Sequence, residues 1–289
     1  MNTNYSYAGK REALSTDDLR RKAPSIFAEN AHHEVSDRYS FVSTLEIVET
    51  LRDNGWSPVS VQEQTVRKED RRGFQRHLIR YQRTGENKPA VVGDSVFELA
   101  CINSHDRSSG IQFFGGLFRF ICANGLCVAD SLVGRISLRH TGVDQEALVR
   151  AALGIANQVP KIEAVVGDWQ AYRLNDVQQS AFAQAAAVAR YGDEIPFHPR
   201  ALLAPRRSGD AGCDLWSTFN RVQENLISGK RLHWTDQNRL GEEGRTVRTV
   251  REVKGIDTNV KLNKALWTLA EALRNGGSLN QVQEAEVVE

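Results

Sequence analysis

The chain has 289 residues, of which 40% are hydrophobic and 25% are charged, and its formal net charge at pH 7 is +1. This composition is typical of a folded soluble protein, and it excludes a chain that is disordered throughout or strongly basic overall. Any contact with nucleic acid must therefore come from local clusters of charge. No apolar run approaches the roughly 20 residues of a membrane-spanning helix, and the N-terminus lacks the apolar core of a secretory signal. We expect a cytoplasmic protein with no membrane partner and four reduced cysteines.

Residues 1–40 are predicted to form an N-terminal arm. The segment from Ser15 can cap a short helix that runs through Lys22 and ends before Pro24. The apolar residues 25–28 then provide a short anchor. This anchor can dock on its own domain, dock on a neighbouring subunit of a homo-oligomer, or lie on the surface, and the sequence leaves the three possibilities open.

Residues 41–142 are predicted to form an α+β core with an antiparallel sheet. A helix is expected from Ser43 or Thr44 to Gly55, because apolar residues recur there at helical spacing. The sequence that follows predicts strands, and periodicity does not decide whether residues 117–121 form a strand or a buried helix. The predicted strands span residues 59–67, 74–83, 97–104 and 136–140. A helix followed by successive strands defines an antiparallel β-meander backed by helices.

Residues 143–274 are predicted to form a mainly helical region that packs on this core. Apolar stripes at helical spacing indicate helices over residues 144–158, 161–189, 213–227 and 256–273. Residues 229–255 interrupt them as a basic, glycine-punctuated loop or hairpin. Residues 275–289 are rich in polar residues and are predicted to be disordered. The fold class is therefore α+β, with a sheet in the first half and helices in the second.

The first basic cluster covers residues 67–83, which contain seven Arg or Lys and two acidic residues, a local net charge of +5. Alternation places Arg76 and Arg80 on one face of a β-hairpin, with Tyr81 nearby. Such a hairpin suits single-stranded DNA, because arginines neutralise phosphates and an aromatic ring stacks on bases. Arg71 and Arg72 in the charged turn belong to the same predicted set. The alternative is a solvated hairpin with scattered arginines.

The second basic cluster covers residues 230–254, with seven basic and four acidic residues and a local net charge of +3. Arg245, Arg248 and Arg251 recur at every third position, which forms a one-sided row if the segment is helical. Arg231 and Trp234 complete this predicted nucleic-acid-binding set. The alternative is a mobile loop of mixed charge.

Only weak candidates for catalysis are present. His105 and Asp106 follow the strand that contains Glu98, and a His beside an Asp at a strand end could act as a general base or bind a metal. However, no second His lies at ligand spacing, and a turn closed by local side-chain hydrogen bonds accounts for the same residues. We therefore predict no catalytic residue, no metal and no cofactor.

Three blocks of sequence together carry a resemblance: NSHDRSSGIQFFGGLFRFICANGL, LWSTFNRVQENLISG and GIDTNVKLNKALWTLAEAL. They resemble a phage- and plasmid-borne domain-of-unknown-function family typified by YubP, YfjQ and YafZ. The resemblance runs roughly from Tyr39 to Leu273. It implies that the protein is carried by plasmids, prophages and phages, often among DNA-maintenance and anti-restriction genes, and it implies no reaction.

These observations together favour a protein that is not an enzyme and that binds nucleic acid, specifically single-stranded DNA, in the maintenance, recombination or establishment of a mobile element. Two alternatives remain open. One is an anti-defence protein that binds a host protein, and the other is a metal-dependent nuclease that uses Glu98, His105 and Asp106.

Overall fold

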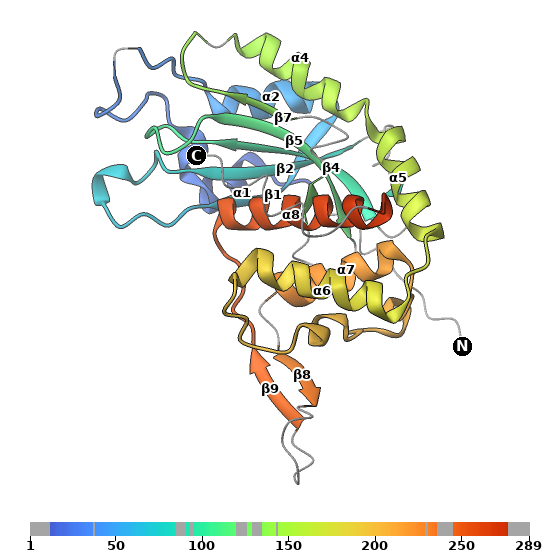
Figure 1. Ribbon diagram of the computed structural model, residues 1–289. Helices are drawn as coiled ribbons and strands as arrows, with labels where there is room; N and C mark the ends of the chain where they lie inside the picture. Colours follow the sequence, from blue (N-terminus) through green and yellow to red (C-terminus); the bar gives the residue numbers. More distant parts are fainter. Residues whose placement is uncertain are drawn as a thin grey trace. The chain divides into compact units, whose positions relative to one another are not determined.

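The computed structural model describes residues 12–36, 38–84, 91–92, 95–119, 126–128, 135–142, 144–228, 231–235 and 245–276. Contacts within the chain divide it into two compact units, and Figure 1 shows the elements of each. Unit 1 comprises Met1–Ile121 and Val128–Ile162, and unit 2 comprises Cys122–Cys127 and Glu163–Glu289. Within the described ranges, no helix is both long enough and apolar enough to cross a membrane.

The N-terminal arm of unit 1 docks on its own domain. Helix α1 (Thr16–Lys22) begins with a capping box in which the Ser15 side chain accepts from Asp18 N, and the short helix η1 (Pro24–Phe27) follows. The Leu14 N–H donates to Pro58 O at 2.7 Å, and Ser25 Oγ lies 2.8 Å from His77 Nδ1. These bonds resolve the alternatives that the sequence left open in favour of the arm's own unit.

Helix α2 (Thr44–Asp53) leads into a sheet with the strand order β1-β2-β4-β5-β6, in which β3 lies beside β4 and β7 beside β5. The pairs β1–β2, β2–β4, β4–β5 and β5–β7 are antiparallel. The turn between β1 and β2 contains the short helix η2 (Glu69–Arg71). The strands are β1 (Trp56–Glu63), β2 (His77–Arg83), β3 (Val91–Val92), β4 (Ser95–Asn103), β5 (Ile111–Arg119), β6 (Leu126–Val128) and β7 (Arg135–Leu138). Residues 117–119 are therefore strand.

Helix α4 (Gln145–Ala156) belongs to unit 1 and packs against α2, β4 and β5. A glycine permits this close approach. A Cβ atom at Gly115 would lie 2.7 Å from the Phe97 ring and 3.0 Å from the Ile155 side chain. The division between the units therefore falls after Ile162, whereas the sequence placed a boundary at residue 142.

Unit 2 is mainly helical. Asn175 caps α6 with a capping box, so the predicted helix over residues 161–189 is two helices, α5 and α6. A tryptophan cluster forms part of the core, and the Trp169 and Trp267 ring centroids lie 4.4 Å apart. The elements are α5 (Val159–Ala171), which spans the unit boundary, α6 (Asp176–Tyr191), η3 (Pro199–Leu203), η4 (Ser208–Asp210), α7 (Leu215–Ile227), β8 (Arg231–Thr235), β9 (Arg245–Thr249) and α8 (Ile256–Arg274).

The predicted fold class is confirmed: an α+β region with an antiparallel sheet precedes a mainly helical region. Cys101 and Cys213 are free thiols, as expected. The predicted disorder of residues 275–289 falls almost wholly on residues 277–289, which lie outside the described residues.

Candidate nucleic-acid interface

Arg76 and Arg80 of the first basic cluster are buried in unit 1. Arg80 is 9% exposed, and its Nε atom lies 3.4 Å from Glu98 Oε2 on the neighbouring strand β4. Gln82 Nε2 donates to the other oxygen of the same carboxylate at 2.8 Å. Arg76 is 6% exposed and Tyr81 is fully buried. Because phosphates and bases can reach only exposed groups, these side chains do not form the open binding face that the alternation predicts.

Arg71 and Arg72 lie at the turn around η2, and each faces carboxylates. Arg71 Nη2 lies 3.1 Å from Glu34 Oε2, and its Nη1 lies 3.9 Å from Asp106 Oδ2. Arg72 Nη1 lies 2.7 Å from Glu69 Oε1, with both side chains exposed. The turn therefore carries its own counter-charges, which weakens its attraction for a polyanion.

His105, one of the strand-end candidates, belongs to a buried hydrogen-bond relay. His77 Nδ1 lies 3.2 Å from Gln75 O, which can only accept, so the proton of the neutral ring is assigned to Nδ1. His77 Nε2 then accepts from Thr44 Oγ1 at 3.0 Å, and this hydroxyl oxygen accepts from His105 Nε2 at 3.2 Å and from Asn103 Nδ2 at 2.9 Å. The relay joins α2 to the ends of β2 and β4, which is a structural role.

The low pKa values of His77 and His105 are poorly suited to general-base catalysis. Burial lowers the pKa of His77 to about 4, and burial together with the nearby His77 and His140 lowers the pKa of His105 to about 3. An efficient general base has a pKa near the pH at which it works. A ring whose pKa is about 3 is a weak base, and His105 is fully buried as well.

The predicted catalytic candidates do not converge. Asp106 Oδ1 accepts from Ser108 N at 3.0 Å, which is the local turn that the sequence suggested as the alternative. Glu98 pairs with Arg80. Glu98 lies five residues before Asn103, the last residue of β4, and this separation corresponds to about 16 Å of extended strand at roughly 3.3 Å per residue. Glu98 is therefore distant from the strand end that His105 and Asp106 follow. Among the described residues, no three His, Cys, Asp or Glu side chains are grouped so that they could hold a metal ion.

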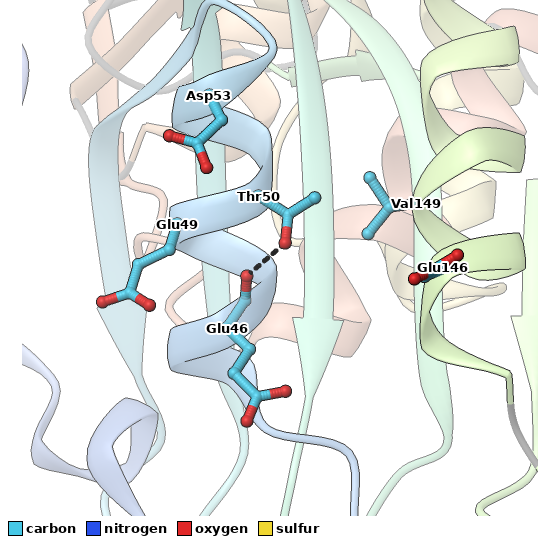
Figure 2. A pocket seen from close by; sticks show the side chains of 6 residues that line it. All are labelled: Glu46, Glu49, Thr50, Asp53, Glu146 and Val149. Carbon is cyan, nitrogen blue, oxygen red and sulfur yellow. Dashed lines mark hydrogen bonds between the residues drawn. The ribbon is translucent and has the colours of Figure 1, made fainter.

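A pocket of about 440 Å³ between α2 and α4 of unit 1 is acidic. Figure 2 shows that Glu46, Glu49 and Asp53 come from α2 and that Glu146 comes from α4. Four carboxylates around one hollow repel phosphates. This side of unit 1 is therefore unfavourable for nucleic acid.

The second basic cluster is a two-stranded antiparallel ribbon formed by β8 and β9 (Figure 1). Its register pairs Arg231 with Thr249, Leu232 with Arg248, and Thr235 with Arg245. Because β9 is a strand, the three-residue spacing of Arg245, Arg248 and Arg251 does not produce a helical row. Arg231 and Arg251 are exposed, and neither forms an ion pair with a carboxylate of the described residues. Trp234 lies in β8, opposite Thr246.

The chain thus combines an α+β unit, whose basic hairpin pairs Arg71, Arg72 and Arg80 with carboxylates, with a helical unit that carries a basic ribbon. Residues 31–267 match the family described as Domain of unknown function (DUF932), and the chain belongs to that family. The UPF0380 proteins YafZ and YfjQ of Escherichia coli (strain K12) are each 35% identical to the chain over 261 residues, which cover 90% of this chain and 91% of each relative. No solved structure matches. The resemblance that the three sequence blocks carry is therefore confirmed.

Proposed function

We propose that the protein binds single-stranded DNA in the cytoplasm, in the maintenance, recombination or establishment of a mobile element, and that the β8–β9 ribbon is its main contact. The observation that carries this proposal is the charge of the ribbon. Its two strands of five residues include Arg231, Arg245 and Arg248 and no Asp or Glu.

Two physical properties of the ribbon favour an unpaired strand. Arginine attracts phosphates whatever the base sequence, and neutralising each phosphate releases condensed counterions. His233 and Trp234 add aromatic rings to the same ribbon. Unpaired bases can stack on such rings, whereas the bases of a duplex are already stacked on one another.

The two sides of the ribbon differ at its base, where Arg231 is exposed and Leu232 is only 2% exposed. Positions two apart in a strand share a side, and so do directly paired positions. Position 245, which pairs with position 235, therefore lies on the same side as Arg231, and position 248 lies on the side of Leu232. The proposal assigns phosphate contacts to Arg231 and Arg245 before Arg248.

The test is binding of the full-length chain to a fluorescein-labelled single-stranded oligonucleotide, followed by fluorescence anisotropy over a series of salt concentrations. For Arg231→Ala combined with Arg245→Ala, we expect the affinity at low salt to fall by roughly 10-fold or more and the salt slope to fall by about 1.4, or about 0.7 for each lost phosphate contact. Arg248→Ala should have a smaller effect than Arg245→Ala, because position 248 lies on the side of Leu232. The two changes are chemically identical, so a difference between them reports only the position of the arginine.

The matched control is Arg150→Ala combined with Arg274→Ala, which removes two positive charges outside the ribbon. Arg150 pairs with Glu146 and Arg274 pairs with Asp168. An affinity and a salt slope that stay at wild-type values in the ribbon variant would contradict the proposal. Tighter binding to a duplex of the same length would contradict the preference for single strands. An absence of binding to any nucleic acid, with recovery of a host protein in a pull-down, would favour the anti-defence alternative.

A further inference from the structure

The root of the ribbon is bonded to the end of helix α7. The Val253 N–H, just after β9, donates to Ile227 O at 3.0 Å, and Ser228 and Glu252 form an isolated antiparallel bridge. Leu232 in β8 and Val250 just after β9 are each 2% exposed. The ribbon therefore emerges from a packed and hydrogen-bonded base.

Arg190, in the last turn of α6, connects the two sides of this base. Its Nη1 atom donates to Leu226 O in the last turn of α7, and its Nη2 atom donates to Arg251 O just after β9. Burial lowers the pKa of Arg190 from its usual value, but a guanidinium remains charged at neutral pH. One side chain thus bridges the carbonyl before the ribbon and the carbonyl after it.

The chemistry of this contact is specific to a guanidinium. The last carbonyls of a helix have no partner within the helix, and a cation that bonds them also interacts favourably with the helix dipole. A planar group with donors on two nitrogen atoms can reach two separate carbonyls at once, whereas lysine offers a single nitrogen. The Ile227 carbonyl is bonded by Val253 N, so α7 and the ribbon share their terminal hydrogen bonds.

We infer that Arg190 is a positioning residue that fixes the root of the β8–β9 ribbon and orders the ribbon before it binds. The inference concerns the same ribbon as the proposed function and rests on that function where binding is concerned. A contact surface that is already ordered loses less conformational entropy when it binds its partner. Arg190 should therefore increase affinity without touching a phosphate.

The first test measures hydrogen exchange of the unliganded full-length chain by mass spectrometry. In Arg190→Ala, we expect amides of β8 and β9 to exchange roughly 10-fold faster or more, because opening of the ribbon becomes easier. Amides of α2 serve as the internal reference, and Arg274→Ala is the matched arginine variant in the same unit. Arg190→Lys keeps the positive charge but lacks the two guanidinium nitrogen atoms that bond the two carbonyls. If the alanine variant does not fold, exchange of the ribbon amides is therefore compared between Arg190→Lys and the wild type. Unchanged ribbon exchange in a folded Arg190 variant would overturn the inference.

The second test uses the anisotropy assay. Arg190→Ala should weaken single-strand binding by roughly 5- to 20-fold with an unchanged salt slope, because the number of phosphate contacts stays the same. A fall in the slope like that of Arg245→Ala would show that Arg190 itself contacts phosphate, and wild-type affinity would also overturn the inference. If the ribbon arginine variants bind normally while Arg190 variants exchange faster, the proposed function fails and the structural role of Arg190 stands.

Discussion

The two basic segments of this protein look alike in sequence and differ in their surroundings. Residues 67–83 carry the larger net charge, +5 against +3 for residues 230–254. In the first segment, Arg71, Arg72 and Arg80 face carboxylates, whereas Arg67 and Lys68 are exposed and have no ion-pair partner among the described residues. In the second segment, neither Arg231 nor Arg251 has an ion-pair partner within the described ranges. The unpaired charges of the two segments therefore lie in different surroundings: beside Glu69 and Asp70 in the turn of the first segment, and at the root of a ribbon whose strands contain no acidic residue in the second.

Burial is the physical reason for the pairing of Arg80. An arginine inside a sheet needs a nearby carboxylate, because an unpaired charge in a low-dielectric environment is strongly destabilising. Glu98 meets this need for Arg80, and both side chains are almost fully buried. An arginine on an exposed ribbon is solvated and needs no partner. A count of charges along the sequence cannot distinguish these two states.

The comparison predicts its largest effect at the buried pair. Glu98→Ala should lower the free energy of unfolding by about 3 to 5 kcal/mol, because Arg80 loses its carboxylate while it remains buried. Denaturant unfolding measures the change. Glu146→Ala, which breaks an exposed pair with Arg150, is the control and should remain close to wild type. Equal effects of the two changes would show that burial does not distinguish the pairs.

The second effect concerns pH and the buried relay of unit 1. Burial holds the pKa of His77 at about 4, against roughly 6.5 in an unfolded chain. Between these values the unfolded chain binds a proton that the folded chain does not, so stability falls as the pH drops from about 6.5 to about 4. The same direction applies to His105, whose pKa is about 3. We expect a loss on the order of a few kcal/mol over this range, measured as a shift of the denaturant midpoint.

His77→Gln separates this contribution from general acid unfolding. The amide keeps a donor and an acceptor but does not titrate, so the variant should be less stable at pH 7 and should lose less stability between pH 6.5 and pH 4. If the variant and the wild type show parallel pH profiles, His77 does not contribute to the acid sensitivity.

Much of the fold was predictable from local signals. Ser15 forms the N-cap of α1 with Asp18 completing the box, Ser43 caps α2, and Asp144 caps α4. Each signal acts within one helical turn, so the sequence contains it in full. Alternation likewise predicted β1 and β2, and an apolar run predicted β4, each within a few residues at either end.

The state of the first basic cluster depends on distant residues, and local patterns do not reveal it. Glu98 lies on another strand from Arg80, and Tyr81 looks the same in sequence whether it is exposed or buried. One signal was present: Glu98 is the single charged residue in β4, and a buried carboxylate requires a cationic or hydrogen-bonding partner. Arg190 offered no such signal, because an arginine in the last turn of a helix is common on solvated helices.

The smallest effect is expected at Arg72, and it completes the comparison. Arg72→Ala and Arg245→Ala remove the same charge from the two basic segments, but Arg72 faces Glu69 at 2.7 Å in an exposed pair. Such pairs contribute little to stability, and a charge beside its counter-charge contributes little to the attraction of a polyanion. We expect Arg72→Ala to change single-strand affinity by less than about 2-fold, with the salt slope unchanged. If it instead weakens binding as much as Arg245→Ala, binding follows total charge, and the ribbon has no special role in the contact.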